Sequence, residues 1–342
     1  MCHNCSSTTD CHTRFNVSRL GLQAPILEGC IRDPVFLKQI IVPCTQNLIN
    51  EHVYINSINT ITNTTQSLKW VKNLPGTATS RVELGLRNGT TYVFIKRPMI
   101  EGKSLLYEAC IQQMVAESLI RGNFPRGAAV VYDVFKLNDG STCFSMEVFR
   151  DSVPLNILLQ NVKGPITALI LEILFQLCAM LWHLSVDLGM NHRDLKPANL
   201  MIEEHVVRPL TLKVGNKSVT IQSRYTISLI DFGFSCIGNT DTQISDIAIG
   251  DVYSSKDPCP KDGRDLYMFL AFLYMECGTR IGSDLRHCFA KWIQNGSTDI
   301  LGKIDKMGRE FDQWIYFIAG SERILRFNCS PMNLFGDLLR FA

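Results

Sequence analysis

The longest apolar stretch of the sequence, residues 166–190, is the feature that most limits how this chain can fold. The stretch contains Glu172, Gln176, His183 and Asp187. They break the run of roughly 18 uncharged apolar residues that a membrane span requires. The stretch therefore predicts a buried helix over residues 166–188, ended by Gly189, and no membrane span.

Composition excludes several classes of protein. The 342 residues have room for one large two-lobed domain or two ordinary ones. Hydrophobic residues make up 46% and charged residues 19%, which excludes a disordered or coiled-coil chain. The 34 Lys and Arg nearly cancel the 32 Asp and Glu, so no nucleic-acid partner or anionic membrane surface is predicted.

The N-terminal region, residues 1–66, shows no sustained helical period and is expected to be an extension of uncertain order. It contains a set of possible zinc ligands: Cys2, His3, Cys5, Cys11 and His12. Only five residues separate Cys5 from Cys11, which is short for a zinc motif, so a tail with incidental cysteines competes with a zinc site. The region lacks the features of a secretion signal, and the 13 cysteines of the chain fit reduced thiols, so an intracellular location is expected.

After residue 67 the pattern alternates like strands and then becomes helical. Asn88-Gly89 separates two β-prone runs, which predicts a hairpin with Lys96 near the end of its second strand. A helix is expected over residues 104–119, and further strands over 128–137 and 143–149. Helices dominate after Pro154, including a buried one over 266–275. Strands followed by helices predict an α+β chain with two segregated lobes.

Two polar motifs lie in fixed order in the second half. The first is His192-Arg-Asp-Leu-Lys-Pro-Ala-Asn199 and the second is Asp231-Phe-Gly233, with Val93-Phe-Ile-Lys96 upstream. Together they match the protein-kinase signature, so the chain resembles a eukaryotic-type Ser/Thr protein kinase. The resemblance implies a two-lobed protein-kinase-like fold. Its expected parts are an N-terminal extension at 1–66, a small lobe with hinge at 67–150 and a large lobe at 151–342.

The same resemblance implies that the chain binds ATP and Mg²⁺. Transfer of a γ-phosphoryl group spreads negative charge over its oxygens, so the site needs cations and metal ligands. Lys96 would hold the α- and β-phosphates, and Glu108 would fix that lysine through an ion pair. Glu117 is a competing partner. Glu108 lies on the helix face expected to pack inward, but spacing alone leaves the choice open.

In the large lobe, Asp194 would orient the hydroxyl of a protein substrate and accept its proton, and Lys196 would neutralise charge on the phosphate in transfer. Asn199 and Asp231 are hard oxygen ligands suited to Mg²⁺. A lysine two places after the catalytic aspartate is typical of the branch of the family that phosphorylates serine and threonine, and this chain resembles that branch. The expected reaction is therefore ATP-dependent phosphorylation of Ser/Thr in proteins.

The resemblance also implies which residues bind the adenine base and which cover the phosphates of the nucleotide. Met146 would be the gatekeeper, and the backbone from Glu147 to Phe149 would bind adenine. The phosphate-covering loop should read G-x-G-x-x-G-x-V, but residues 74–82 keep only Gly76, out of register, and Val82 at the valine place. Because glycine lets backbone amides approach phosphates closely, this loop is expected to cradle ATP less well.

Other departures shape the choice of function. The interval from Asn199 to Asp231 implies an insertion around residues 203–224, and no A-P-E motif follows Asp231. These features look most like the divergent kinases of large DNA viruses. That resemblance implies that the protein is located in the cytoplasm or nucleus of an infected host cell. The eroded glycine loop favours a second hypothesis, a catalytically weak pseudokinase that acts as a scaffold. A third, a small-molecule phosphotransferase, is disfavoured by Lys196.

Two further roles follow from the resemblance. Asp265 would brace the catalytic loop from a buried helix. Arg193 would pair with a phosphorylated residue of the activation segment, or else with a carboxylate. The candidate phosphorylation sites are Ser235, Thr240, Thr242, Ser245 and Tyr253.

Overall fold

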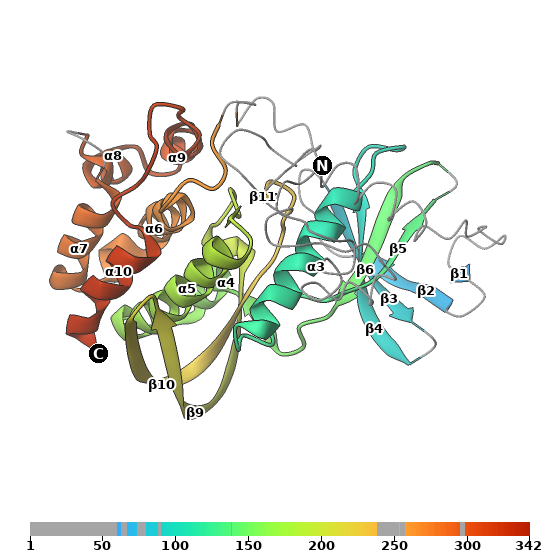
Figure 1. Cartoon of the computed structure of the whole chain (residues 1–342), viewed down its shortest axis with the longest axis horizontal. Helices are drawn as coiled ribbons and strands as arrows, with labels where there is room; N and C mark the ends of the chain where they lie inside the picture. The colour runs from blue at the N-terminus through green and yellow to red at the C-terminus, as the bar shows by residue number, and fades with distance from the viewer. Residues whose placement is uncertain are drawn as a thin grey trace, which may run out of the picture. The chain divides into compact units, whose positions relative to one another are not determined.

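The structure, a computed structural model, describes residues 60–62, 67–73, 80–87, 90–137, 139–237, 253, 257–294 and 298–342 (Figure 1). The chain divides into two compact units. Unit 1 comprises residues 1–117 and 129–150, and unit 2 comprises residues 118–128 and 151–342. Unit 1 is rich in strands and unit 2 in helices, so the predicted α+β class is confirmed.

An antiparallel sheet forms the main part of unit 1, with strand order β1-β2-β3-β4-β6-β5. Its strands are β1 (Thr60–Thr62), β2 (Ser67–Asn73), β3 (Ser80–Arg87), β4 (Thr91–Pro98), β5 (Val131–Lys136) and β6 (Thr142–Glu147). The predicted hairpin is present, because β3 pairs with β4 from Ser80↔Pro98 to Arg87↔Thr91. β-branched and aromatic residues favour the extended backbone of β4.

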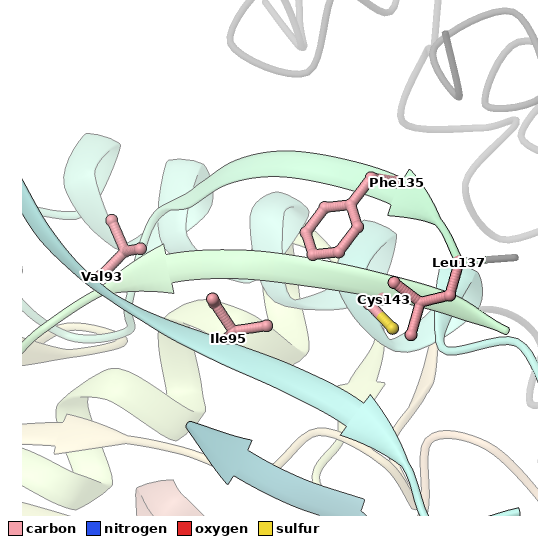
Figure 2. Close-up of a cluster of buried hydrophobic side chains, with 5 residues drawn as sticks. All are labelled: Val93, Ile95, Phe135, Leu137 and Cys143. Carbon is pink, nitrogen blue, oxygen red and sulfur yellow. The ribbon is translucent and has the colours of Figure 1, made fainter. Parts of the chain in front are cut away.

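One face of this sheet carries a buried apolar cluster (Figure 2). Val93 and Ile95 of β4 contribute to it together with Phe135, Leu137 and Cys143. Both β4 residues are fully buried. Since side chains alternate along a strand, burial of Val93 and Ile95 on this face directs the next residue, Lys96, to the other face.

Helix α3 (Leu106–Arg121) follows β4 and is tied to the chain that leads into β5. Ala109 and Met114 are buried on α3. Two buried glutamines add hydrogen bonds: Gln112 Nε2 donates to Ala129 O at 3.0 Å, and Gln113 Oε1 accepts from Val131 N at 3.0 Å. These contacts fix α3 against the β5 side of unit 1.

Unit 2 is built around α5 (Thr167–Asp187), which the sequence predicted as a buried helix. By length and composition α5 could cross a membrane, but 67% of its most apolar window is buried inside the protein, as in the core helix of a globular domain. Phe175 of α5 packs edge-to-face on Phe335 of α10, with ring centroids 5.6 Å apart. The other helices are α4 (Leu155–Asn161), α6 (Arg264–Cys277), α7 (Ser283–Ile293), α8 (Ile300–Met307), α9 (Asp312–Ala319) and α10 (Pro331–Leu338).

A long antiparallel hairpin occupies the interval in which the sequence predicted an insertion. It consists of β9 (Leu200–Val214) and β10 (Lys217–Leu229), and β9 also pairs with β7 (Ser152–Pro154). Glu172 of α5 holds the hairpin where its register shifts. The Glu172 Oε1 atom accepts from Ser223 Oγ at 2.8 Å and from the amides of Arg224 and Tyr225 at 2.7 and 2.8 Å. The insertion is therefore a continuous extension of two strands.

Candidate active site

The lysine and the carboxylate expected near the phosphates of ATP form a buried ion pair in unit 1. Lys96 Nζ on β4 donates to Glu108 Oε1 on α3, and the two side chains are 4% and 2% exposed. Glu117, the competing partner, instead accepts from Gln113 Nε2 at 2.8 Å. Glu108 lies in the first turn of α3, where the positive end of the helix dipole also favours a carboxylate.

The residues expected to cover the phosphates are only partly described. Val82 is half-buried on β3, directly opposite Lys96 in the strand register. Directly opposite residues on paired strands share a face of the sheet, so Val82 and Lys96 lie on the same face. Ser80, at the third glycine place of the loop, begins β3 and is buried. Gly76 lies outside the described residues.

The expected adenine-binding segment follows the end of β6. Glu147, the last residue of β6, donates from its backbone N to Val130 O at 2.9 Å. Phe149 is buried. The Met146 sulfur accepts from Gln112 Nε2 at 3.2 Å, which links the expected gatekeeper to α3.

In unit 2, the expected catalytic residues meet around one carboxylate. Asp194 is 3% exposed. Lys196 Nζ donates to its Oδ1 at 2.9 Å and to its Oδ2 at 3.0 Å, and Asn199 Nδ2 donates to Oδ2 at 2.9 Å. These contacts place a cation beside the carboxylate, joined to it by charge-assisted hydrogen bonds.

Asn199 and Asp231, the expected Mg²⁺ ligands, lie at the base of the β9–β10 hairpin. Leu200 pairs with Leu229, and Ile230 N donates to Asn199 O at 3.1 Å. The residues just before and just after the hairpin therefore lie side by side. Asn199 Nδ2 also donates to Asp194 O at 2.8 Å. Because Nδ2 of Asn199 donates to Asp194, Oδ1 is the amide atom suited to bind a metal ion. It is a hard oxygen ligand of the kind that Mg²⁺ prefers.

A buried aspartate braces the loop that carries Asp194. Asp265, near the start of α6, accepts from the backbone amides of His192 at 2.8 Å and Arg193 at 2.9 Å, and from Asn191 Nδ2 at 3.3 Å. Arg193 has a left-handed backbone conformation with φ of 65°. Residues other than glycine rarely adopt this conformation. The two hydrogen bonds that these backbone amides donate to Asp265 hold the loop in that conformation.

His192 and Phe232 pack on each other, with ring centroids 5.1 Å apart. The His192 Nε2 atom lies 2.9 Å from Ile230 O. These contacts connect the loop that carries Asp194 to the Asp231-Phe-Gly233 segment through side-chain packing.

Arg193 pairs with a carboxylate, which was one of the two alternatives for it. Asp257 lies 2.8 Å from Arg193 Nη2 and 2.7 Å from both Arg264 Nη2 and Lys261 Nζ, and all four side chains are 0% exposed. Burial, together with repulsion from Arg264, lowers the pKa of Arg193 to about 10 and the pKa of Lys261 to about 8.

Two of the candidate phosphorylation sites have buried hydroxyls. Tyr253 is 2% exposed and its hydroxyl donates to Arg193 O. Ser235 is fully buried and its hydroxyl donates to His192 O at 3.2 Å. Thr240, Thr242 and Ser245 lie outside the described residues.

Two features of the site carry no clear signal in the sequence. The hydroxyl of Tyr316, on α9, donates to Asp194 Oδ1. A disulfide joins Cys236, in β11 (Cys236–Ile237), to Cys259. The expectation of reduced thiols is wrong for this pair, because the fold brings together two cysteines that are 23 positions apart.

The residues that the structure describes contain no cluster of typical metal-binding side chains. Within those ranges, no group of three or more His, Cys, Asp or Glu side chains could hold a metal ion. The cysteines and histidines of the possible zinc site lie in residues 1–12, outside those ranges.

Comparison with known proteins identifies the fold. No family model matches the sequence, and no curated protein does so either. Among solved structures, the chain is similar to the crystal structure of the BubR1 kinase domain, with a TM-score of 0.53 and 12% sequence identity. The match covers 84% of this chain and 96% of that one. The chain therefore has a protein-kinase-like fold.

Proposed function

We propose that this chain is a protein kinase that transfers the γ-phosphate of ATP to serine or threonine hydroxyls of protein substrates. One observation carries the proposal: the Asp194 carboxylate with Lys196 and Asn199 at 2.9 Å, in a chain with a kinase-like fold. A carboxylate that can take the proton of an incoming hydroxyl, beside a cation that can offset phosphate charge, suits phosphoryl transfer.

Residues of unit 1 would bind the nucleotide. Lys96 would contact the α- and β-phosphates while Glu108 keeps its ammonium in place. The half-buried Val82, at the end of the phosphate-covering loop, would contact the nucleotide, and the backbone from Glu147 to Phe149 would bind the adenine base. When bound through Asn199 and Asp231, Mg²⁺ would neutralise charge on the phosphate oxygens.

Residues of unit 2 would act on the acceptor. Asp194 would orient the substrate hydroxyl and take its proton, and Lys196 would stabilise negative charge on the phosphate in transfer. Lys196 also supports serine and threonine as acceptors, through the family resemblance. The long hairpin after Asn199 and the missing A-P-E motif support a relationship to the divergent kinases of large DNA viruses.

A phosphate-transfer assay tests the proposal. The full chain is incubated with Mg²⁺, γ-labelled ATP and general protein substrates, and the labelled residue type is identified by phosphoamino-acid analysis. Asp194→Ala should abolish the transfer, whereas Asp299→Ala, which removes only the N-cap of α8, should retain it. Equal activity of the Asp194→Ala variant and the unaltered chain would refute the mechanism.

A pseudokinase scaffold is the second candidate, and the eroded glycine loop favours it. Gly76 is the only glycine in the stretch where three are expected, and fewer glycines mean fewer close backbone contacts to phosphate. A thermal-shift measurement with ATP and Mg²⁺ separates the candidates. A kinase should be stabilised by the nucleotide, because a ligand that binds only the folded state raises its stability. Absence of both stabilisation and transfer would favour the scaffold.

A further inference from the structure

A tyrosine from the C-terminal part of unit 2 lies against the catalytic carboxylate. The hydroxyl of Tyr316 donates to Asp194 Oδ1, across 122 positions of sequence. Lys196 Nζ donates to the same hydroxyl oxygen at 3.2 Å and lies 5.9 Å from the centre of the tyrosine ring. The phenol oxygen therefore contacts both the catalytic carboxylate and the cation of the catalytic loop.

Packing of α9 fixes the position of this tyrosine. The ring of Tyr316 lies 5.5 Å from the ring of Phe272 on α6. Ile315 and Ala319, on the same helix, are fully buried. Since close-packed neighbours hold both the ring and the helix that carries it, the hydroxyl is held at Asp194 by the fold.

The hydroxyl of Tyr316 completes the set of donors to Asp194. An ionised carboxylate has about four acceptor positions. Oδ1 accepts from Lys196 and Tyr316, and Oδ2 accepts from Lys196 and Asn199. Lys196 and Asn199 belong to the catalytic loop itself, so among the described residues Tyr316 is the donor that comes from outside it. Its hydroxyl thus lies where an acceptor hydroxyl would bind.

We propose, on the basis of the kinase function above, that Tyr316 is phosphorylated intramolecularly at this site. The Tyr316 oxygen forms a bond to the γ-phosphorus of ATP, and the bond from that phosphorus to the β-phosphate oxygen breaks. The phenolic proton goes to the Asp194 carboxylate, and ADP leaves with the electron pair of the broken bond. A nucleophile in hydrogen-bond contact with its base is the arrangement that such a transfer requires.

The electrostatic surroundings suit a phenol that keeps its proton until transfer. Burial and the negative charge of Asp194 raise the pKa of Tyr316 above its ordinary value. The neutral phenol is therefore the ground-state form and donates its hydrogen to Asp194. Lys196, on the same oxygen, can offset the negative charge that develops as the proton leaves.

Two other described tyrosines lack parts of this arrangement. Tyr274 has a carboxylate partner, Asp305, at 3.0 Å, but this carboxylate lies outside the catalytic loop. Tyr253 is buried and donates to a backbone carbonyl. Tyr274 therefore serves as the matched control, because it shares the hydroxyl–carboxylate contact but makes it at a different carboxylate.

Phosphorylation of a tyrosine by a site proposed to act on serine and threonine has a physical basis. A hydroxyl held by the fold reacts at a high effective concentration, whereas a free substrate must first bind and be oriented. The packing of α9 supplies that orientation for Tyr316, so its reaction does not require that tyrosines in other proteins be accepted.

The experiment measures phosphate on Tyr316 of the chain itself. The full chain is incubated with Mg²⁺ and ATP, alone and with a serine/threonine protein substrate, at several protein concentrations. Mass spectrometry then locates phosphate within the tryptic peptide of residues 310–323, in which Tyr316 must be distinguished from Ser321. The variants are Tyr316→Phe, which keeps the ring and its packing, Tyr274→Phe as the control and Asp194→Asn.

The proposal predicts phosphate on Tyr316 that forms with a rate constant independent of protein concentration. Tyr316→Phe and Asp194→Asn should each lose it, and Tyr274→Phe should retain it in full. A chain that phosphorylates the protein substrate but carries no phosphate on Tyr316 overturns this inference and leaves the kinase function standing. A rate constant that rises with protein concentration overturns the intramolecular route. A chain that labels neither itself nor the substrate overturns the proposed function as well.

Discussion

Asp257 and Arg193 form an ion pair at 2.8 Å in which neither side chain reaches solvent. Arg264 and Lys261 contact the same carboxylate, so one buried negative charge offsets three buried positive ones. A charge that loses its partner in such surroundings keeps its full desolvation penalty. The loop that carries Arg193 and Asp194 is therefore held in place by a carboxylate supplied by the chain itself.

Asp257→Asn should lower the free energy of unfolding by about 3–5 kcal/mol, because the three cations would lose their buried counter-charge. Urea unfolding measures the loss. Glu276→Gln is the control, since Glu276 pairs with an Arg309 side chain that is 72% exposed, and such pairs contribute about 0–1 kcal/mol. Similar losses for the two variants would contradict the role of the buried cluster.

Asp265→Asn should destabilise the catalytic loop. The asparagine amide can no longer accept two backbone hydrogen bonds through charged oxygens, and each such bond contributes about 1.5–3 kcal/mol. We expect a loss of about 3 kcal/mol or more in urea unfolding, together with loss of phosphate transfer. Asp299→Asn, at the N-cap of α8, should cost about 1 kcal/mol or less. Unchanged unfolding of Asp265→Asn would show that the brace is not needed.

Glu108→Gln should reduce phosphate transfer by at least about tenfold, equivalent to about 1.4 kcal/mol of transition-state stabilisation. The neutral amide would hold Lys96 less firmly at the position proposed for the phosphates. The matched control is Glu117→Gln, on the same helix, because Glu117 contacts Gln113. Initial rates at saturating ATP and at low ATP test this. Equal rates for the two variants would contradict the assignment of Glu108.

Stability should fall as the pH rises above about 8.5. Burial raises the pKa of the Cys143 and Cys277 thiols to about 12, whereas thiols in unfolded chains titrate near about 8.5. Between these values the unfolded chain releases protons that the folded chain keeps, so alkaline pH favours unfolding, by up to about 1.4 kcal/mol per thiol and pH unit. Thermal unfolding between about pH 7.5 and 10 measures the fall. The double variant Cys143→Ala with Cys277→Ala should show a shallower slope, and an unaltered slope would refute this cause.

Reduction of the Cys236–Cys259 disulfide should lower stability by about 3 kcal/mol, because the bond closes a loop with a separation of 23 positions and restricts the unfolded chain. Unfolding with and without dithiothreitol tests this. The double variant Cys236→Ser with Cys259→Ser should show no effect of the reductant. An equal effect of the reductant on both proteins would trace it to another part of the chain.

The sequence predicted those parts of the site whose geometry is local. Asp194, Lys196 and Asn199 lie within six positions, so the spacing of one loop determines their contacts. One loop separates the strand that carries Lys96 from the helix that carries Glu108 in its first turn. Their ion pair could therefore be anticipated as one of two options. Strand alternation and the Asn88-Gly89 signal likewise predicted the β3–β4 hairpin.

Contacts between segments far apart in the sequence could not be predicted from the sequence pattern. Tyr316 reaches Asp194 across 122 positions, and Asp257 reaches Arg193 across 64. Both depend on how α9 and the segment before α6 pack in three dimensions, and nothing in the local pattern of either segment encodes its partner. The disulfide was missed for the same reason, because counting cysteines does not show which pairs the fold brings together.

The β9–β10 hairpin has a consequence for how this segment can change in evolution. Its base, at Leu200↔Leu229, sets the distance between Asn199 and Asp231, although 32 positions separate these residues in sequence. Adding one residue to one strand would turn every later side chain of that strand to the opposite face, including those that contact α5. Viable insertions and deletions in this segment should therefore occur in matched pairs across the two strands, or else fall where the register already shifts beside Ser223.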